Sequence, residues 1–324
     1  MNNALGVPEK KGNGIGGFRV WSKRHQQLLV RARRIAKHHD PVLIEGESGT
    51  GKTLLGLYLH EASFRSTGNL VKVGCGEIDH NMIESVLFGH CRGAYTGAFR
   101  EQDGLLTAAH ESSLLLDDID LLPLRYQSRL LRFLDDGLYH RLGEPDHFKK
   151  SDVRLIVTTN KHLAELVDQK QFLPDLYYRL KCWRLKTSPL RERPEDIVEL
   201  AEYYMAEYCN KYQVGGELPV FSKDGLDFLK EMAWPGNVRE LKQAVANICM
   251  FRPEKGNVIT MQQVVEILFD PLYGQDSLEL TGEQRLHTIL KSTNWNISLV
   301  SRITGHSRTT IYKRIRANGW SMPD

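Results

Sequence analysis

The stretch that decides the fold is "PVLIEGESGTGKTLLGLYLHEA", residues 41–62. It begins with an apolar run, Val42–Ile44, continues through a glycine-rich turn and ends in a segment with helical spacing of apolar residues. The turn, Gly46–Thr53, fits the pattern Gly-x-x-x-x-Gly-Lys-[Ser/Thr]. Backbone N–H groups in such a turn can surround phosphate oxygens, and the following helix points its positive N-terminus at the same anion. The stretch predicts a strand, a phosphate-binding loop and a helix.

Two side chains at the end of the turn carry the predicted chemistry. Lys52 is placed to reach the β- and γ-phosphates of ATP, and the hydroxyl of Thr53 is suited to Mg²⁺. ATP and Mg²⁺ are therefore the predicted cofactors, and an incidental glycine-rich turn is the alternative. The residues predicted to bind ATP are Gly46, Glu47, Ser48, Gly49, Thr50, Gly51, Lys52 and Thr53.

Three more apolar runs predict neighbouring strands, with helical patterns between them. The runs are "NLVKVGC" at 69–75, "SSLLLDDID" at 112–120 and "DVRLIVTTN" at 152–160. Strands that alternate with helices predict the α/β class, with a parallel sheet between two layers of helices. Asp117 ends the second run and is predicted to hold Mg²⁺, while Asp118 is placed to orient or deprotonate the attacking water. A solvated acidic turn is the alternative.

Domain boundaries follow from changes in these patterns. The N-terminus is polar and glycine-rich, and from Pro194 onward the pattern is entirely helical. The predicted divisions are 1–17 for a disordered N-terminus, 18–190 for the α/β domain, 191–262 for a helical subdomain, 263–281 for a linker and 282–324 for a small all-α domain.

The composition excludes several classes of protein. Apolar residues make up 41% of the 324 residues, so a sizeable core can be buried. No run approaches the ~20 apolar residues that cross a bilayer, and the N-terminus lacks the apolar region of a secretory signal. The five cysteines are scattered and form no Cys-x-x-Cys pair, which favours free thiols in a reducing cytosol. We therefore expect a cytoplasmic protein without a membrane partner.

The C-terminal segment carries an excess of positive charge. Residues 282–324 hold seven basic and two acidic residues, whereas the whole chain has a net charge of +3. The stretch "WNISLVSRITGHSRTTIYKRIRANGW", 295–320, has two helical patterns joined at Gly305, with Ser307 placed as the N-cap of the second. This predicts a helix-turn-helix that binds double-stranded DNA, and a solvated basic face or a plain helical hairpin is the alternative. The predicted DNA contacts are Ser307, Arg308, Thr309, Thr310, Tyr312, Lys313 and Arg314.

A second glycine-rich stretch, "FGHCRGAYTGAFR" at residues 88–100, has a bulky tip. It is too rich in glycine for a helix and too poor in β-branched residues for a strand, so we predict a loop. Gly93 and Gly97 give the backbone freedom, Tyr95 offers a stiff aromatic surface and Thr96 adds a hydroxyl. A surface turn whose Tyr95 packs on its own domain is the alternative.

Together these motifs resemble those of bacterial enhancer-binding proteins, the AAA+ activators of RNA polymerase carrying sigma-54. The matching elements, in order, are "GESGTGKT", "GAYTGA", "LLLDD", "VTTN", "DLYYRL", "PLRER" and "WPGNVREL", followed by a segment similar to a Fis-type helix-turn-helix. The resemblance implies an AAA+ P-loop domain, a helical lid subdomain, an active hexamer and a mobile finger that touches sigma-54 as ATP is hydrolysed. The residues implied in that contact are Gly93, Ala94, Tyr95, Thr96, Gly97 and Ala98.

The resemblance also implies roles for three positions elsewhere. Asn160 is similar to the family's first sensor of the γ-phosphate, Arg179 to an arginine finger delivered to the neighbouring subunit's nucleotide, and Arg239 to the second sensor on the lid. With Asp117 and Asp118 these are the predicted catalytic residues. A surface ion pair is the alternative for both arginines.

Three positions depart from the family pattern. Asp118 stands where Glu is usual, Gly74 where an Asn usually restrains the catalytic carboxylate, and Leu173 where many members carry another Arg. A shorter carboxylate positions water differently, so slower hydrolysis is expected. The changes at 74 and 118 are predicted to compensate each other, so that a double-mutant cycle of Gly74→Asn and Asp118→Glu would be non-additive.

The sequence thus predicts an ATP-driven activator of sigma-54 transcription, tethered to upstream DNA by its C-terminal domain. The alternative is a DNA-binding regulator with a degenerate AAA+ domain that binds ATP for assembly but hydrolyses it poorly; "GAYTGA" disfavours another AAA+ class. The chain matches a short form of the family without an N-terminal regulatory domain, so control by a partner protein or by synthesis is expected. The ring is predicted to be a homo-oligomer, with a ring mixed with a paralogue as the alternative.

Overall fold

The computed structural model describes residues 20–214, 216–253, 256–269 and 282–321. The described residues up to Ser188 form an α/β unit, and those from Pro189 onward form a helical unit. The N-terminal segment predicted to be disordered, 1–17, lies outside the described residues. Within the described ranges, the helices are too short or too polar to span a bilayer.

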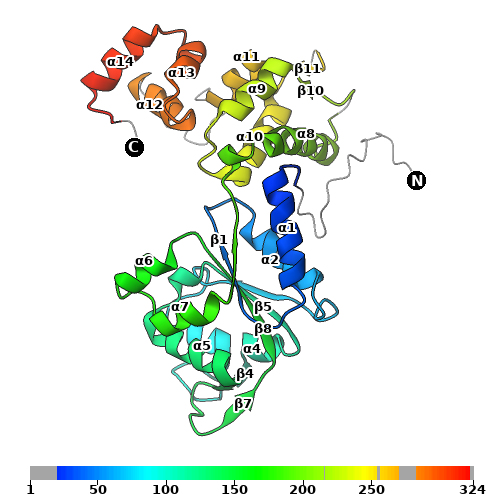
Figure 1. Cartoon of the computed structure of the whole chain (residues 1–324), viewed down its shortest axis with the longest axis vertical. Coiled ribbons are helices and arrows are strands. Elements are labelled where there is room, and N and C mark those ends of the chain that lie inside the picture. Colours follow the sequence, from blue (N-terminus) through cyan, green and yellow to red (C-terminus); the bar gives the residue numbers. More distant parts are fainter. Residues whose placement is uncertain (1–19, 215, 254–255, 270–281, 322–324) are drawn as a thin grey trace. The chain divides into compact units, whose positions relative to one another are not determined.

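The α/β unit is built on a five-stranded sheet with the order β2-β5-β8-β1-β9, in which every neighbouring pair is parallel (Figure 1). The strands are β1 (Val42–Glu45), β2 (Val71–Gly74), β5 (Ser112–Asp117), β8 (Val153–Thr159) and β9 (Trp183–Lys186). The helices are α1 (Lys23–Ile35), α2 (Lys52–Glu61), α3 (Ile83–Phe88), α4 (Leu105–Ala108), α5 (Leu124–Asp136), α6 (Leu163–Asp168) and α7 (Pro174–Leu180), with a 3-10 turn η1 (Ile119–Leu121). The predicted α/β class and the first four strands are confirmed, whereas β9 was not predicted.

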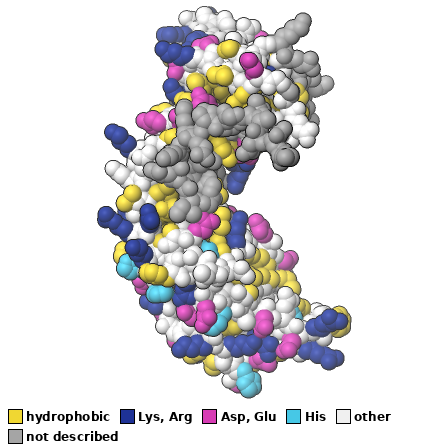
Figure 2. Space-filling model, turned by 90° about the vertical axis from the view of Figure 1, so that its right-hand side faces the viewer, with side chains coloured by type: hydrophobic (Ala, Val, Ile, Leu, Met, Phe, Trp, Pro, Cys, Tyr) yellow, Lys and Arg dark blue, Asp and Glu magenta, His cyan; other side chains and the backbone are white. Residues whose placement is uncertain are grey.

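Helices cover both faces of this sheet, and the residues of β5 alternate between the two resulting cores. Leu115 lies in the core that contains Leu55 of α2, whereas Leu114 and Leu116 lie in the core that contains Leu130 of α5. Successive residues of a strand point to opposite faces of the sheet, and residues paired across neighbouring strands point to the same face. The alternation in β5 therefore shows which face each paired residue of the neighbouring strands points to. On the face of this unit seen in the lower half of Figure 2, basic and acidic side chains are interspersed.

Two short hairpins extend from the α/β unit. The strands β3 (Gly89–His90) and β4 (Gln102–Asp103) pair antiparallel and enclose the predicted glycine-rich loop. The strands β6 (Leu138–His140) and β7 (Phe148–Lys150) form the second hairpin. The loop is therefore an insertion whose two ends are held together by backbone pairing.

The first three helices of the helical unit follow the helical pattern that the sequence shows from Pro194 onward. They are α8 (Pro194–Lys211), α9 (Lys223–Glu231) and α10 (Asn237–Phe251), preceded by the 3-10 turn η2 (Leu190–Glu192) and accompanied by a small sheet of β10 (Val220–Phe221) and β11 (Val258–Ile259). The predicted linker 263–281 is wrong at its start, because Met261–Phe269 forms helix α11, which packs against α9 and α10. Val264 and Ile267 are buried, so this apolar stretch belongs to the core of the helical unit. The rest of the predicted linker, 270–281, lies outside the described residues.

The last three helices form their own small core. They are α12 (Gly282–Ser292), α13 (Ile297–Thr304) and α14 (Arg308–Ala317). Gly305 lies in the turn between α13 and α14 with a φ of 69°, and the Ser307 hydroxyl accepts the Thr310 N–H at 3.1 Å. The predicted turn and N-cap are therefore confirmed. Val300 of α13 and Ile311 of α14 are buried in this core, so the two helices pack through their apolar faces.

Candidate functional site

The phosphate loop lies between β1 and α2, at the carboxyl edge of the sheet. The N–H of Gly46 donates to the Thr159 carbonyl of β8 at 3.2 Å. A Cβ at Gly46 would lie 2.0 Å from Thr187 Oγ1 and 2.9 Å from Thr187 O, so only glycine fits. The Thr187 hydroxyl is also 2.8 Å from Thr50 Oγ1. The segment after β9 thus supports the loop, a contribution that sequence reasoning missed because β9 itself was not predicted.

Lys52 is buried in the first turn of α2 and reaches back into the loop. Its Nζ donates to the Gly46 carbonyl at 2.9 Å and to the Glu47 carbonyl at 3.1 Å. Phosphate oxygens are stronger partners for an ammonium group than neutral carbonyls, because both groups in that hydrogen bond are charged. The geometry therefore places a cation where the predicted phosphates would lie.

Asp117 ends β5 beside the phosphate loop, and both of its carboxylate oxygens accept hydroxyl hydrogen bonds. Thr53 Oγ1 donates to Oδ2 at 2.8 Å, and the Thr158 hydroxyl of β8 donates to Oδ1. Carboxylate and hydroxyl oxygens are ligands that Mg²⁺ prefers, so Thr53 and Asp117 fit the predicted ion. In the described part of the chain, no three His, Cys, Asp or Glu side chains are grouped to hold a metal.

Asp118 follows in an unusual backbone conformation. Its φ is 54°, in the left-handed region where non-glycine residues are uncommon and often functional. Its N–H donates to Thr158 Oγ1 at 3.2 Å. Thr158 therefore contacts both acidic residues, although the sequence analysis singled out only the nearby Asn160.

A third carboxylate, that of Asp120, lies at the same edge with its side chain only 2% exposed. It accepts the Thr159 hydroxyl at 2.6 Å, and Lys161 Nζ is 3.6 Å from its other oxygen. The pKa of the nearby Cys75 thiol is raised to about 12, first by burial and then by the three neighbouring carboxylates. This edge of the sheet is thus an electrostatically negative environment in which a bound cation is favoured.

The other two predicted catalytic residues of this unit, Asn160 and Arg179, lie in different places. Asn160 directly follows β8 at the acidic edge and is exposed. Arg179 lies in α7, where its Nη2 donates to the Leu134 carbonyl at 2.7 Å and its Nε is 3.5 Å from Asp135 Oδ1. Its side chain is 48% exposed. In the single chain Arg179 therefore contacts the end of α5, as the surface-ion-pair alternative expected.

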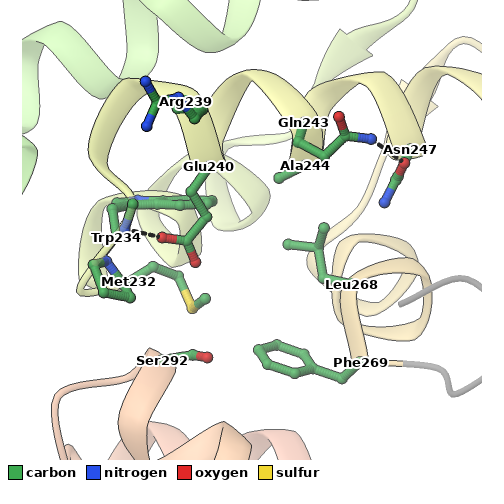
Figure 3. Close-up of a pocket in the computed structure, with 12 residues that line it drawn as sticks. Met232, Trp234, Arg239, Glu240, Gln243, Ala244, Asn247, Leu268, Phe269 and Ser292 are labelled. Carbon is green, nitrogen blue, oxygen red and sulfur yellow. Dashed lines mark hydrogen bonds between the residues drawn. The ribbon is translucent and has the colours of Figure 1, made fainter. Parts of the chain in front are cut away.

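Arg239 lies near the start of α10 in the helical unit and is exposed. A cavity of about 600 Å³ lies beside α10, and Figure 3 shows Arg239 at its rim, pointing away from Glu240. The Glu240 carboxylate accepts the Gly236 N–H at 2.7 Å, and burial raises the Glu240 pKa. The apolar lining includes Met232, Trp234, Leu268 and Phe269.

The predicted finger, Gly93–Ala98, is a compact loop closed by a hydrogen bond from the Gly93 N–H to the Ala98 carbonyl at 2.9 Å. Gly93 and Gly97 have φ values of 83° and 103°, and nothing lies within 4 Å of a Cβ built on either. Glycine is therefore favoured at these two positions because of the positive φ, since a side chain there would have room. The Tyr95 ring packs edge-on against the ring of buried His90, with centroids 5.1 Å apart. In this conformation Tyr95 packs on its own domain, as the alternative interpretation of the loop expects.

Phe99, just beyond the finger, is the aromatic that faces solvent. Its side chain is 83% exposed, whereas Tyr95 is half-buried. Sequence reasoning missed Phe99 because the motif directed attention to the loop tip; the signal was an aromatic in a glycine-rich stretch with no periodic apolar partners. The base of the loop is tied to the β6–β7 hairpin, since the Cys91 N–H donates to the Leu142 carbonyl at 3.0 Å.

The predicted DNA-contact residues occupy the start and one side of α14. The side chains of Ser307, Arg308, Thr309, Tyr312 and Lys313 are exposed, and those of Thr310 and Arg314 are partly buried. Arg314 Nε lies 3.5 Å from Glu283 Oε1, so part of its charge is already balanced.

Comparison with known proteins identifies the family. Residues 19–186 match the sigma-54 interaction domain, and residues 191–272 match an AAA+ ATPase lid domain. The formate hydrogenlyase transcriptional activator FhlA of Escherichia coli is 34% identical over 92% of this chain and 44% of its own length. The alginate biosynthesis regulatory protein AlgB of Pseudomonas aeruginosa is 34% identical over 94% of this chain and 68% of its own length. This chain therefore spans less than half of FhlA.

Solved structures show the same fold. NtrX from Brucella abortus in complex with ADP has a TM-score of 0.70 at 24% identity, covering 93% of this chain and 70% of that one. NtrX in complex with ATP has a TM-score of 0.69 at 26% identity, covering 94% and 70%. With the two domain matches and the similarity to AlgB over nearly all of this chain, these findings place the chain in the sigma-54-dependent transcriptional activator family.

Proposed function

We propose that this chain is an ATP-driven activator of sigma-54 transcription. A hexameric ring hydrolyses ATP, the finger Gly93–Ala98 moves against sigma-54 to open promoter DNA, and the C-terminal helices hold the ring on upstream DNA. The observation that carries the proposal is that Lys52, the Thr53–Asp117 pair and the finger belong to one unit built on a single sheet. Nucleotide chemistry and finger position can therefore be coupled through one packed core.

The roles proposed for the site follow from its contacts. Lys52 exchanges its two carbonyl partners for phosphate oxygens, and Thr53 with Asp117 would hold Mg²⁺, which neutralises phosphate charge when bound. Asp118 and Asn160 lie at the same edge and bind the attacking water or the γ-phosphate. NtrX, at 26% identity, has been solved in complex with ATP, which supports a nucleotide in the corresponding loop of this chain.

Substitutions in and beside the finger should distinguish ATP hydrolysis from the coupling of hydrolysis to promoter opening. Tyr95→Ala and Phe99→Ala should each leave ATP turnover within about twofold of the unchanged protein. Each should lower the rate of promoter opening by roughly tenfold, because the loss of one aromatic contact with sigma-54 costs about 1.4 kcal/mol or more. Phosphate release and open-complex formation, measured on the same samples, check this. Phe64→Ala is the matched control, since Phe64 is 74% exposed elsewhere on the unit. Normal promoter opening by the double variant would contradict the proposed contact.

The DNA-binding proposal predicts an electrostatic signature. Lys313→Ala should weaken binding about equally for all DNA sequences and reduce the slope of log affinity against log salt by about one, because one phosphate contact is lost. Lys291→Ala, an exposed lysine of α12 outside the predicted face, is the control. Fluorescence anisotropy over a range of salt concentrations measures both slopes. Equal slopes for the two variants would count against α14 as the DNA-binding element.

The decisive experiment is reconstitution. Purified protein, ATP, a sigma-54 promoter and RNA polymerase carrying sigma-54 should yield open complexes, and omission of ATP should prevent them. Failure to open any sigma-54 promoter with ATP present would contradict the proposed activity.

A second candidate function is a DNA-binding regulator that binds ATP for assembly but hydrolyses it poorly. The left-handed Asp118, one methylene shorter than the usual Glu, and the bare Gly74 favour it. Phosphate release with and without Lys52→Ala discriminates the two functions. A release rate that does not depend on Lys52 supports the regulator.

A further inference from the structure

Glu77 lies over Gly74 at the end of β2. A Cβ built on Gly74 would be 2.8 Å from Glu77 Cδ and 3.0 Å from its Cγ and Oε1. The Glu77 N–H also donates to the Gly74 carbonyl at 3.0 Å, so a tight turn folds the glutamate back onto the strand. The side chain of Glu77 therefore fills the space that a side chain at position 74 would take.

The strand register places Glu77 on the phosphate-loop face of the sheet. Gly74 pairs with Asp117 in the parallel ladder of β2 and β5, and paired residues point to the same face. Leu116 faces the core beneath α5, whereas Leu115 faces the core beneath α2, so Asp117 and Gly74 both point to the α2 side. Adjacent strands are about 4.8 Å apart. The Glu77 side chain, which lies against the Cβ position of Gly74, is thus on the phosphate-loop side of the sheet, next to the strand that ends at Asp117.

Glu77 is also available for chemistry. Its side chain is exposed, and among the described residues that side chain forms no hydrogen bond or ion pair. Asp117, in contrast, has both oxygens engaged by hydroxyls. Asp118 has a shorter arm, and its backbone is held by Thr158. Of the acidic side chains near the end of β5, Glu77 has the longest arm.

We propose that Glu77 is a catalytic residue that orients the attacking water in this chain, an inference that rests on the ATPase activity proposed above. The water oxygen forms a bond to the γ-phosphorus as the bond from that phosphorus to the bridging oxygen breaks. The electron pair of the broken bond stays on ADP, and the Glu77 carboxylate accepts the water proton and releases it to solvent. Position 74 lacks a side chain because Glu77 occupies that space.

The test compares ATP turnover by the full chain and its variants. Glu77→Gln keeps the shape of the side chain but removes its basicity, so kcat should fall by about 10²-fold or more, as for a lost general base. Affinity for ADP should stay within about twofold, because the proposed role places Glu77 beside the water that attacks the γ-phosphate, which ADP lacks. Glu165→Gln, an exposed glutamate of α6, is the matched control.

A second variant tests position as well as chemistry. Gly74→Ala places a Cβ only 2.8 Å from Glu77 Cδ, closer than van der Waals contact, so it should displace Glu77 and lower kcat in the unchanged background. In the Glu77→Gln background it should add no further loss, which is a non-additive double-mutant cycle.

The outcomes separate the two proposals. Turnover by Glu77→Gln within about twofold of the unchanged protein, while Lys52→Ala abolishes turnover, would overturn the role of Glu77 and leave the ATPase standing. An unchanged protein without ATP turnover would overturn both.

Discussion

Lys52→Ala is expected to lower ATP turnover by about 10²–10³-fold, the cost of removing one preorganised group that stabilises charge in a transition state. The Lys52 ammonium is buried and already lies 2.9 Å from the Gly46 carbonyl and 3.1 Å from the Glu47 carbonyl. A transferring phosphoryl group carries negative charge on its oxygens, and a fixed cation at this point stabilises it without reorganisation. Phosphate release under saturating ATP measures the effect.

Lys150→Ala is the matched control, because Lys150 is an exposed lysine of β7 in the same unit. Thermal unfolding of both variants shows whether the fold is kept. A folded Lys52→Ala protein that retains more than roughly a fifth of the turnover would contradict the assigned role, since so small a loss corresponds to only about 1 kcal/mol.

Arg179→Ala is expected to lower turnover by about 10³-fold or more, the range for a lost arginine finger. In the single chain Arg179 contacts Leu134 and Asp135 of its own α5 end. Its half-exposed guanidinium is therefore free to exchange a weak surface ion pair for a neighbour's phosphate. Turnover should also rise steeply with protein concentration, because the finger acts only across a subunit interface.

Mixing two inactive proteins gives the sharpest test of this role. The Arg179→Ala protein keeps an intact Lys52, and the Lys52→Ala protein keeps an intact Arg179. In randomly mixed head-to-tail rings, an intact Lys52 would therefore face an intact Arg179 at roughly a quarter of the interfaces, which would be active. Arg31→Ala, an exposed arginine of α1, is the control and should behave as the unchanged protein. A mixture as inactive as its components would contradict a finger delivered in trans.

The sequence predicted those parts of the fold that depend on local pattern. Val42–Ile44 and the run ending at Asp117 are apolar and bounded by glycine or acidic residues, and both became strands of the central sheet. Ser307 is a good N-cap because its hydroxyl satisfies a free N–H of the first turn, an interaction within four residues. Such features need no knowledge of the rest of the chain.

The remaining parts depend on contacts between distant segments. β9 is only four residues long and alternates in burial, so its pairing with β1 had no strong local signal. Thr187 contacts Thr50 across 137 residues of sequence. Tyr95 and His90 are close in sequence, yet their ring contact depends on how the loop folds. The α11 helix was interpreted as part of a linker because prolines and glycines flank it.

The two hydroxyls that hold Asp117 have a consequence for how an ion is admitted. Thr53 and Thr158 each contribute a single O–H dipole, and such a dipole can reverse by torsion about one C–O bond. The divalent ion proposed for this site would therefore be admitted when the two O–H groups turn away from Asp117, while both threonine backbones, on α2 and β8, stay where they are. The empty and loaded forms of the proposed site would then differ at Asp117 mainly in the orientation of two hydroxyl protons, without a rearrangement of the sheet.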